Sequence, residues 1–445
     1  MGDHGGWSAA RLIPVTGIGS QVEAETRAVS AVLAVMTTVR DLSIEIFAPW
    51  GASRAAKATV EAYTEPQFVM SGKKLRPDGF IRVSFGRSVW QALVEVKTGS
   101  SCLDPEQLNL YWDLARREGF DAVVSISNEI APAPGAHPTE SLKARANAKV
   151  QIHHLSWTAL LTTAVKVKVH HGVDDPEQAW LLGELIRYLE HPASGTMAFD
   201  DMGPNWTTVR DATRDSGLHK SDAGVRDIVM RWDQLLRYSA LHLGSRIGED
   251  VQQVFSRNQQ DQKNRVAYLT DEICGNGCLD GALRIPNTAG DIGIKADLKA
   301  RRLATTLTVT APEDRGDRAR CTWIVGQLSE ASDDLIIEAY PKYSRLPTTV
   351  RLGDAREDRS LLLNGDQKRE LARFRLIQMA EMGSSRKARQ RSQGFIESVT
   401  ELIEGFYATV VQNITPWVPR APKMNDQDST NDNQLEEQTD LTPAG

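Results

Sequence analysis

The sequence predicts an α/β fold in its amino-terminal third and a separate α+β domain after it, and three observations lead to this prediction. Helical and strand patterns alternate over roughly the first 170 residues, which is typical of an α/β domain. Two short β-rich runs, 80–85 and 89–96, flank Gly86-Arg87 as the arms of a hairpin would. A long apolar stripe that starts near residue 223 opens a second series of helices and strands.

The elements of the first region follow from apolar periodicity and from the signals that begin helices. Asp104 and Pro105 are a typical N-cap and first-turn pair, so a helix is expected from there to about residue 118. A buried strand is expected over 121–127. The other expected elements are a helix over 21–36, with Val22, Val29, Val32, Leu33 and Met36 on one stripe, a strand over 150–155, and helices from Ser156 and from Asp175-Pro176 to His191.

The second region begins after a stretch rich in Gly, Asp, Pro and Thr, 191–221, which we expect to be a linker. A long helix is predicted over 223–255 from the spacing of its apolar side chains. Further strands are expected at 282–285, 291–299, 305–310 and 335–339, and further helices at 318–328, 366–382 and 394–412.

The length of 445 residues exceeds what one hydrophobic core usually serves. We therefore expect domains over 1–190 and 222–420, followed by an acidic, disordered tail over 421–445. That tail holds six acidic residues and one lysine, so most of the net charge of -6 lies there. The overall acidity consequently does not exclude a local basic groove.

Composition narrows the class of protein. Hydrophobic residues make up 41% of the chain and charged residues 25%, which is ordinary for a soluble globular protein. No apolar run has the length of a membrane span and the first residues lack a secretory core, so no membrane association is expected. Four scattered cysteines do not form the pattern of a disulfide scaffold, which favours a cytoplasmic location.

The hairpin around Gly86-Arg87 gives a geometric expectation for three side chains. Glycine in the first loop position suits a two-residue type II′ turn, in which the two flanking residues face each other. Counting back along both strands then places Asp78 opposite Glu95, and directly opposed side chains have Cβ atoms about 5 Å apart. Lys97 lies two residues beyond Glu95, so its side chain points to the same face of the sheet.

Two acids and a lysine in this arrangement suit phosphodiester cleavage. Two carboxylates so close repel each other unless one is protonated or a cation lies between them. A hard divalent ion takes carboxylate oxygens as ligands, lowers the pKa of a bound water and offsets charge on a phosphate. A neighbouring ammonium group orients the attacking water or stabilises the developing negative charge.

The same residues carry a resemblance to a known family. Arg76-Pro77-Asp78-Gly79, followed by Glu95-Val96-Lys97, resembles the PD-(D/E)XK superfamily of restriction-endonuclease-like nucleases. The next helix carries Gln107 and Tyr111, similar to a Gln-x-x-x-Tyr element of several branches. The resemblance covers roughly the first third of the chain and implies an αβββαβ core.

The resemblance also implies roles for individual residues. It implies that Asp78, Glu95 and the carbonyl of Val96 hold Mg²⁺, with Mn²⁺ able to replace it. It implies that Lys97 serves the attacking water and that the products carry 5′-phosphates. Some members use a further acid on the first helix, and Glu25 is the candidate here because Val22, Val29 and Met36 share its helical face while Glu23 points elsewhere.

Other interpretations of these residues stay open. If the resemblance is accidental, Glu95 and Lys97 are solvated neighbours on a surface hairpin. Gln107 occupies the third helical position after Asp104, where a capping-box residue belongs, so capping and function are equally supported. Tyr111 is expected to pack half-buried rather than to act as a catalyst.

Several further motifs are expected to be structural. Asp291, Asp297 and Lys299 repeat the acid-acid-lysine pattern, but they alternate with apolar residues as on a half-buried strand with a basic outer face. Cys274 and Cys278 lack a second ligand pair at zinc spacing. Ordinary roles are also expected for the histidine pairs 153–154 and 170–171 on the surface, the basic residues Arg386, Lys387, Arg389 and Arg391 in a loop, and Trp206 and Trp323 as core or interface aromatics.

Taken together, the sequence predicts a Mg²⁺-dependent nuclease that hydrolyses DNA, with Asp78, Glu95, Lys97, Gln107 and Glu25 as its catalytic residues. Bacterial restriction, repair or antiphage defence is a placement by analogy. The long helix over 223–255 is the expected surface for a homodimer. A nuclease acting on RNA, a catalytically silent nucleic-acid-binding module and an interaction protein remain alternatives, although the intact acid-acid-lysine set argues against the silent module.

Overall fold

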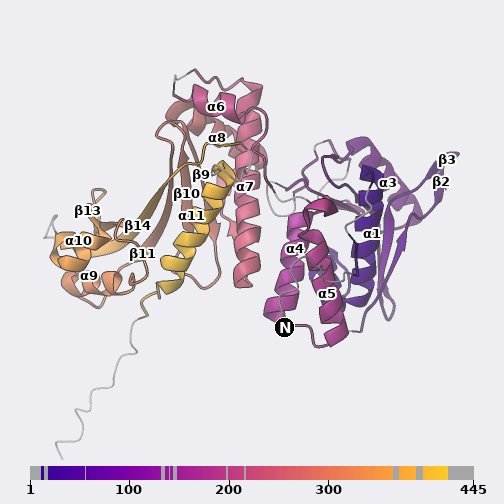
Figure 1. The fold of residues 1–445 in the computed structure, drawn as a ribbon, viewed down its shortest axis with the longest axis horizontal. Coiled ribbons are helices and arrows are strands. Elements are labelled where there is room, and N and C mark those ends of the chain that lie inside the picture. Colours follow the sequence, from indigo (N-terminus) through magenta and orange to yellow (C-terminus); the bar gives the residue numbers. More distant parts are fainter. Residues whose placement is uncertain are drawn as a thin grey trace, which may run out of the picture.

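The computed structural model describes residues 12–14, 19–55, 57–131, 136–139, 141–143, 148–196, 199–214, 217–363, 370–386 and 394–418. These residues form a mixed α/β structure with two large sheets, one in each of the two lobes that Figure 1 shows. Each large sheet has its own hydrophobic core. No helix in the described ranges is both long and apolar enough to cross a membrane. The tail expected over 421–445 lies outside the described residues.

The first sheet has the strand order β1-β4-β5-β6-β7. The first three strands in this order, β1, β4 and β5, pair antiparallel, whereas β5, β6 and β7 run parallel to one another. Its strands are β1 (Thr59–Thr64), β4 (Gly79–Phe85), β5 (Ser88–Val96), β6 (Ala122–Ser127) and β7 (Gln151–Ser156), and a small separate pair consists of β2 (Phe68–Met70) and β3 (Lys73–Leu75).

Helices cover both faces of this sheet. Because successive side chains of a strand point to opposite faces, Val94 and Val96 enter one core while Leu93 enters the other. The Leu93 face lies under α3 (Pro105–Glu118). Glu95 and Lys97 belong to the same face as Leu93. The opposite core is built with α1 (Gln21–Thr38), α2 (Arg40–Phe47), α4 (Trp157–Val165) and α5 (Pro176–Leu189).

The hairpin and the parallel part of the sheet follow the sequence prediction, as do α1, α3, α4 and α5. Asp104 caps α3 by accepting a hydrogen bond from the Glu106 N–H at 2.9 Å, with Pro105 as the first helical residue. Strand β1, the β2–β3 pair and α2 were not predicted. Val22 lay on the predicted apolar stripe of α1, but the side chain is 71% exposed because the stripe turns to solvent at the first turn.

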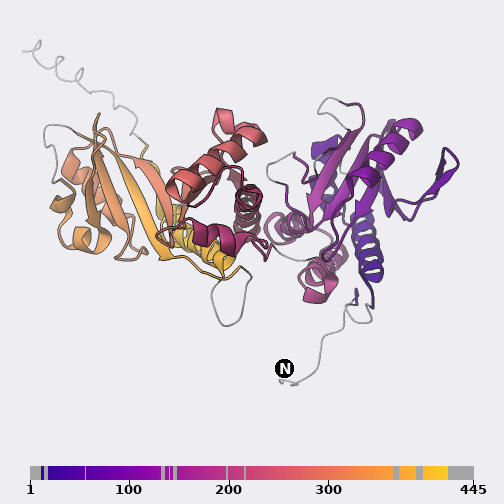
Figure 2. The same cartoon turned by 90° about the horizontal axis from the view of Figure 1, so that it is seen from above.

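The second large sheet has the order β13-β12-β14-β11-β10-β9-β8, and its described pairs are antiparallel. Figure 2 shows the two sheets and their lobes from above. The strands are β8 (Gln252–Gln253), β9 (Cys278–Arg284), β10 (Ile292–Asp297), β11 (Arg302–Thr310), β12 (Ile336–Pro341), β13 (Thr348–Arg351) and β14 (Leu371–Glu381). The helices of this region are α6 (Trp206–Ala212), α7 (Ala223–Ile247), α8 (Gln262–Asn276), α9 (Asp317–Gly326), α10 (Leu352–Glu357) and α11 (Phe395–Thr409). The short helical turns of the chain are η1 (Ala48–Trp50), η2 (Lys166–His171), η3 (Pro192–Ser194), η4 (Arg257–Gln260), η5 (Arg359–Leu363) and η6 (Val411–Asn413).

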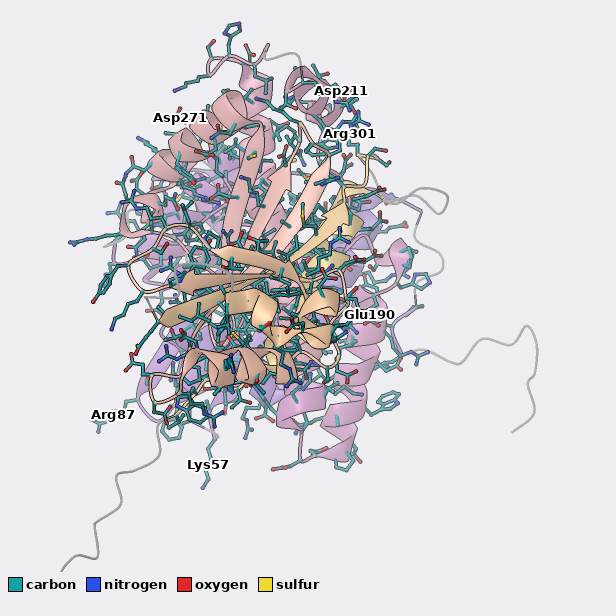
Figure 3. The ribbon with its side chains drawn as sticks, turned by 90° about the vertical axis from the view of Figure 1, so that its left-hand side faces the viewer. Lys57, Arg87, Glu190, Asp211, Asp271 and Arg301 are labelled. Atoms are coloured by element: carbon teal, nitrogen blue, oxygen red, sulfur yellow. The ribbon has the colours of Figure 1, made fainter. Side chains whose placement is uncertain are left out.

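Three sequence predictions for the second region were wrong in part. The long helix ends at Ile247 rather than at 255, because Gly248 caps it in the left-handed conformation (φ 78°). The segment 366–382 was predicted as a helix, but β14 lies there, between β11 and β12. The expected linker 191–221 contains α6, which packs in the second core through the fully buried Trp206. Figure 3 labels Asp211 of α6 beside Arg301, with which it forms an ion pair at 3.5 Å.

Helix α7 packs inside the chain on two sides. Its apolar side chains, among them Trp232 and Leu236, are buried in the second core, so the surface predicted for a homodimer is already covered. On another side α7 meets α4 of the first region, where Thr162 donates to the Leu241 carbonyl at 3.2 Å. Next to this contact His170 bonds the carbonyl of Ser245 at 3.0 Å.

Candidate functional site

The hairpin register agrees with the geometry expected from the sequence. Gly79 pairs with Val94 along β4 and β5, and the loop between the strands has Gly86 in the left-handed conformation (φ 58°). Asp78 immediately precedes β4, so it lies across from Glu95 at the end of the hairpin. The sequence pattern therefore corresponds to a real juxtaposition of these two acids.

The carboxylate of Asp78 bonds the backbone of the opposite strand. Its Oδ2 accepts a hydrogen bond from the Val96 N–H at 2.7 Å. Lys97 donates its own N–H to the Ile126 carbonyl at 2.8 Å, so the backbone of Lys97 faces β6 and that of Val96 faces β4. The residue opposite Val96 in this register is Pro77, which has no N–H. The Val96 carbonyl therefore receives no backbone hydrogen bond from Pro77.

Lys97 lies between two acids. Its Nζ donates to Glu95 Oε1 at 2.5 Å, and it lies 4.0 Å from Oε2 of Glu25 on α1. The Glu95 side chain is only 2% exposed, whereas those of Lys97 and Glu25 are each 17% exposed. The structure thus brings Glu25 to the lysine, as its position on the first helix suggested, and opens the site to solvent on the lysine side.

Burial shapes the electrostatics of the three groups at the hairpin end. Burial and, second, the nearby Asp78 charge raise the pKa of Glu95 to about 8. Burial is also the main reason that the pKa of Asp78 is raised. Burial alone would lower the pKa of Lys97, but its hydrogen bond to Glu95 and the surrounding carboxylates raise that pKa. Lys97 is therefore charged, but one ammonium group is not enough to keep both acids ionised, and Glu95 holds its proton at neutral pH.

This acid pair fits a divalent cation. Glu95 Oε2 is buried and accepts no hydrogen bond from a donor group within the described ranges, and the Glu95 and Asp78 carboxyls lie within hydrogen-bond reach of each other. Asp78 and Glu95 each use one oxygen in a described hydrogen bond, and the strand geometry directs the Val96 carbonyl to the side of β5 on which its N–H meets Asp78. No set of three or more His, Cys, Asp or Glu side chains in the described residues is arranged to hold a metal. The ligand set is thus two carboxylates and a carbonyl, with waters for the remaining positions of a hard ion.

Gln107 and Tyr111 support the site from α3. The Gln107 amide donates to the Tyr111 hydroxyl at 3.1 Å, and that hydroxyl donates to the Arg76 carbonyl at 3.3 Å. Burial and, second, the Glu95 charge raise the pKa of Tyr111 to about 12, so the hydroxyl stays protonated. This chain of bonds holds α3 to the segment that leads into Asp78. A capping box would require the Gln107 side chain to bond the backbone N–H of Asp104 at the helix N-terminus. The described bond of Gln107 goes to Tyr111 instead.

Sequence reasoning missed the polar groups that follow the lysine. Gln21 of α1 bonds both the carbonyl and the hydroxyl of Thr98, the latter at 2.9 Å. Asn128 donates to the carbonyls of Gly99 and Gly195, each at 2.9 Å. These bonds tie the end of β5 to the first helix and to the chain beyond α5. A lone Gln and a lone Asn give no motif by which a sequence alone would reveal them.

A second polar row lies on the same face of the sheet. Ser125 of β6 is paired with Glu95 in the parallel register, and the next strand places His154 beside Ser125. Ser125 Oγ contacts His137 at 2.9 Å and His154 at 3.0 Å, and the other ring nitrogen of His154 contacts the Glu129 carbonyl at 2.7 Å. The expectation that this histidine lies on the surface was therefore wrong.

The remaining candidates take structural roles. Asp291 forms a two-bond ion pair with Arg284 at 2.8 Å, and Asp297 accepts from the Ala300 N–H at 2.8 Å. Cys274 and Cys278 are free thiols. Arg386 pairs with Asp201 at 3.0 Å, whereas Lys387, Arg389 and Arg391 lie outside the described residues.

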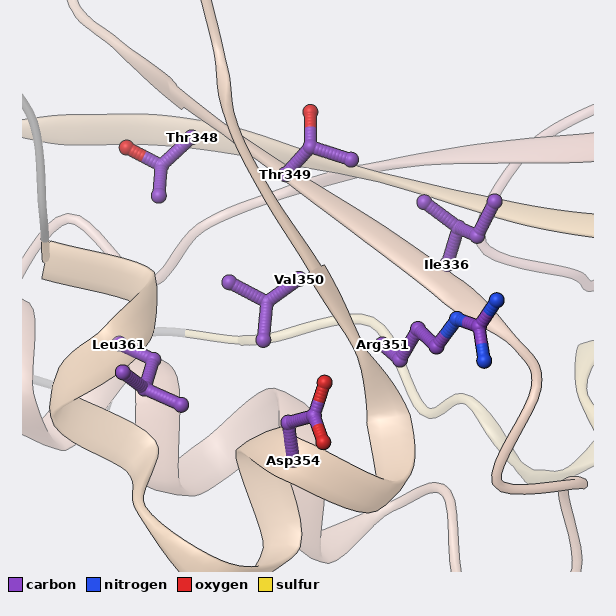
Figure 4. A pocket seen from close by; sticks show the side chains of 7 residues that line it. All are labelled: Ile336, Thr348, Thr349, Val350, Arg351, Asp354 and Leu361. Carbon is purple, nitrogen blue, oxygen red and sulfur yellow. The ribbon is translucent and has the colours of Figure 1, made fainter.

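A cavity of about 490 Å³ lies far along the chain from the acid pair, between β13 and α10. Figure 4 shows its lining, in which Asp354 and Arg351 are the charged side chains. None of the predicted site residues contributes to it. The acid pair at the hairpin end is therefore the site with a chemical rationale.

Comparison with known proteins identifies no relative: no family model, no curated protein and no solved structure matches this chain.

Proposed function

We propose that this protein is a metal-dependent nuclease whose centre consists of Asp78, Glu95 and Lys97. One observation carries the proposal. The half-buried Asp78 and the buried Glu95 lie opposite each other at the end of a hairpin, and Oε2 of Glu95 accepts no hydrogen bond from a donor group of the described residues. Burial and the neighbouring Asp78 raise the pKa of Glu95 to about 8, so the pair keeps a proton unless a cation takes its place. A divalent cation between the two groups would allow both to ionise.

Asp78, Glu95 and the Val96 carbonyl would hold Mg²⁺ or Mn²⁺. When bound, such an ion supplies a water of lowered pKa and offsets negative charge on the phosphate. Asp78 is oriented for this role by the Val96 N–H, which fixes one of its oxygens. Lys97 remains protonated, so its ammonium group can orient the attacking water or neutralise charge that develops on the phosphate.

Two neighbours act as positioning groups. Glu25 lies 4.0 Å from Lys97, so it limits the positions that the ammonium group can take. The Gln107–Tyr111 pair holds the backbone before Asp78 from the side of α3. Gln107 and Tyr111 therefore position the backbone and transfer no proton in the proposed reaction.

The chain order of the first region supports a restriction-endonuclease-like core. Helix α1 precedes the antiparallel strands β1, β4 and β5, and α3 then connects β5 to the parallel strand β6. This is the αβββαβ order that the resemblance implies, with α2 and the β2–β3 pair as additions. DNA is proposed as the substrate on the resemblance, and RNA is the alternative that the assay separates.

Cleavage assays with purified protein test the proposal. The protein is incubated with plasmid, linear and single-stranded DNA and with RNA, in Mg²⁺ and in EDTA. We expect metal-dependent cleavage that Lys97→Ala reduces at least about a hundredfold, because a group that acts in the transition state is removed. The matched control is Lys57→Ala, since Lys57 is exposed and precedes the end of β1 that pairs with Ser84, away from the acid-pair end at Gly79.

The outcomes are distinct. Equal cleavage by the wild type and the Lys97→Ala variant removes the lysine from the mechanism. If the protein binds nucleic acid but cleaves none of the substrates, the proposed enzyme activity is overturned and the protein is a nucleic-acid-binding module. Cleavage of RNA alone keeps the centre and changes the substrate.

A further inference from the structure

A second cavity, of about 100 Å³, lies where α7 meets the first region. One wall comes from β7 and the start of α4, and another from η1. Helix α7 closes it with Arg237 and Leu241. By volume it holds several waters, since one water needs about 10–15 Å³ of such space. The lining includes Trp50, His153 and Ser156 as well as the two residues of α7.

Arg237 is the charged group of this lining. Its guanidinium forms no hydrogen bond and no ion pair with any residue in the described ranges. Burial lowers the pKa of Arg237, and only the charge of Asp250 opposes that effect. Arg237 also borders an adjoining cavity of about 180 Å³, which Asp250 lines as well. A guanidinium has five N–H donors, so a half-buried one without partners leaves much bonding capacity unused.

His153 is the second unused polar group of the cavity. Its ring stacks on Trp50 with the ring centres 4.7 Å apart and the planes 5° from parallel. Neither ring nitrogen bonds a described residue, in contrast to His154, which uses both. Burial lowers the pKa of His153 to about 4, so the neutral ring carries one N–H.

We propose that this cavity binds a small oxyanion, a phosphate or carboxylate group, through the fork of Arg237 and the ring N–H of His153. The planar fork of arginine matches the paired oxygens of either group. An anion would also offset the charge that Arg237 carries into a partly buried place. The cavity is separate from the acid pair, so this site is independent of the proposed nuclease activity.

Such a ligand would join the two regions of the chain. Arg237 comes from α7, whereas His153 and Trp50 come from the first region. The oxyanion would add bonds across the contact that Thr162 and Leu241 already make. Occupancy would therefore strengthen the packing of α7 against the first region.

Calorimetric titration of the full-length protein tests the site. Inorganic phosphate and acetate are the two probes, at constant ionic strength set with chloride and without divalent metal. We expect at least one of them to bind the wild type, and Arg237→Gln to weaken that binding about 10- to 100-fold. Arg246→Gln is the matched control on the same helix, because Arg246 pairs with Glu404 outside the cavity. Both probes are repeated with Lys97→Ala, which should bind as the wild type does.

The results decide the proposal. Binding of phosphate alone assigns a phosphate-bearing ligand, and binding of both probes admits a carboxylate. No binding of either probe to the wild type overturns the site, and so does equal affinity in Arg237→Gln. Loss of binding in Lys97→Ala would show that the anion binds at the acid pair, which also overturns the proposed cavity site. If Arg237→Gln does not fold, Arg237→Lys keeps the charge without the fork and should weaken binding about tenfold.

Discussion

The carboxylate of Asp78 accepts a hydrogen bond from the backbone N–H of Val96 at 2.7 Å, across the open end of the β4–β5 hairpin. In a continued ladder that N–H would bond a backbone carbonyl of the opposite strand. Here the Asp78 side chain accepts this hydrogen bond in place of a backbone carbonyl. The strand that carries Glu95 therefore sets the position of one Asp78 carboxylate oxygen. The geometry of the acid pair thus depends on backbone register rather than on flexible side chains.

Asp78→Asn should weaken divalent-ion binding strongly while the fold is retained. Asparagine keeps an oxygen that can accept from the Val96 N–H, but it lacks the charge that a cation needs. We expect the affinity for Mn²⁺ or Mg²⁺ to fall at least tenfold to a hundredfold, measured by calorimetry. Asp113→Asn is the control, because Asp113 pairs with Lys143 on the outer side of α3. Unchanged metal affinity in Asp78→Asn would count against the site.

Gly79→Ala should destabilise the first region. An added Cβ would lie 2.7 Å from Cδ1 of Leu33 and 3.4 Å from Cβ of Val94, so the buried Leu33 side chain would have to move. Overpacking of this kind costs about 1–3 kcal/mol in the free energy of unfolding, which urea denaturation measures. Gly326→Ala is the control, since nothing lies within 4 Å of its added Cβ. Leu33→Val should relieve part of the cost in the double variant, and strictly additive effects would contradict the contact.

Tyr111→Phe should slow cleavage more than it weakens substrate binding. The change removes the hydroxyl that accepts from Gln107 and donates to the Arg76 carbonyl. We expect a loss of about 1 kcal/mol in the free energy of unfolding, together with a lower kcat and a nearly unchanged KM. The control is Tyr63→Phe, because Tyr63 is 52% exposed. A change in KM alone would make Tyr111 a substrate contact rather than a positioning residue.

His154, a half-buried histidine of β7, should make the free energy of unfolding depend on pH. Burial lowers the pKa of His154 to about 3, below the ordinary value of 6.5, so the unfolded chain binds a proton that the folded chain does not. The contribution of His154 to the free energy of unfolding is therefore fully present above about pH 6.5 and decreases as the pH drops, by up to about 1.4 kcal/mol per pH unit. Glu95 contributes a slope of opposite sign in this window, because its pKa in the folded chain is raised to about 8. Urea unfolding between pH 7 and pH 5 measures the slope.

His154→Gln should reduce that slope, whereas His219→Gln should leave it unchanged because His219 is exposed. The groups that face His154 are Ser125, the Glu129 carbonyl and His137, whose pKa burial lowers to about 4. His137 and His153, whose pKa burial also lowers to about 4, therefore contribute to the remaining slope. An identical slope in the wild type and in His154→Gln would show that His154 is not buried in its neutral form.

The acid pair was predictable because a short loop fixes register. Once Gly86 and Arg87 form a two-residue turn, every facing pair along the hairpin follows by counting. The contacts of Gln21, Asn128 and Ser125 were not predictable, because they join segments whose spacing in the sequence carries no periodic signal. Their positions depend on how α1, β6 and the chain after α5 meet at one edge of the sheet.

The misassigned strand β14 shows where local pattern fails. Its residues include good helix formers, and Leu371 and Phe374 are spaced as on a helical face. Pairing with β11 on one side and β12 on the other overrides that preference, with Phe374 and Leu376 buried on one face of the sheet. In the supposed linker, the buried Trp206 was the one clue to α6, since a large aromatic residue is rarely left exposed.

Helix α4 links Lys97 to the second region of the chain. Trp157, its first residue, donates its indole N–H to the Lys97 carbonyl at 2.8 Å, and the same helix packs against α7. A fragment that ended before α7 would leave this side of α4 facing water. The first region is consequently not a portable catalytic module: transplanting it into another protein would require a new partner for α4, or a redesigned α4 surface, to keep the lysine in place.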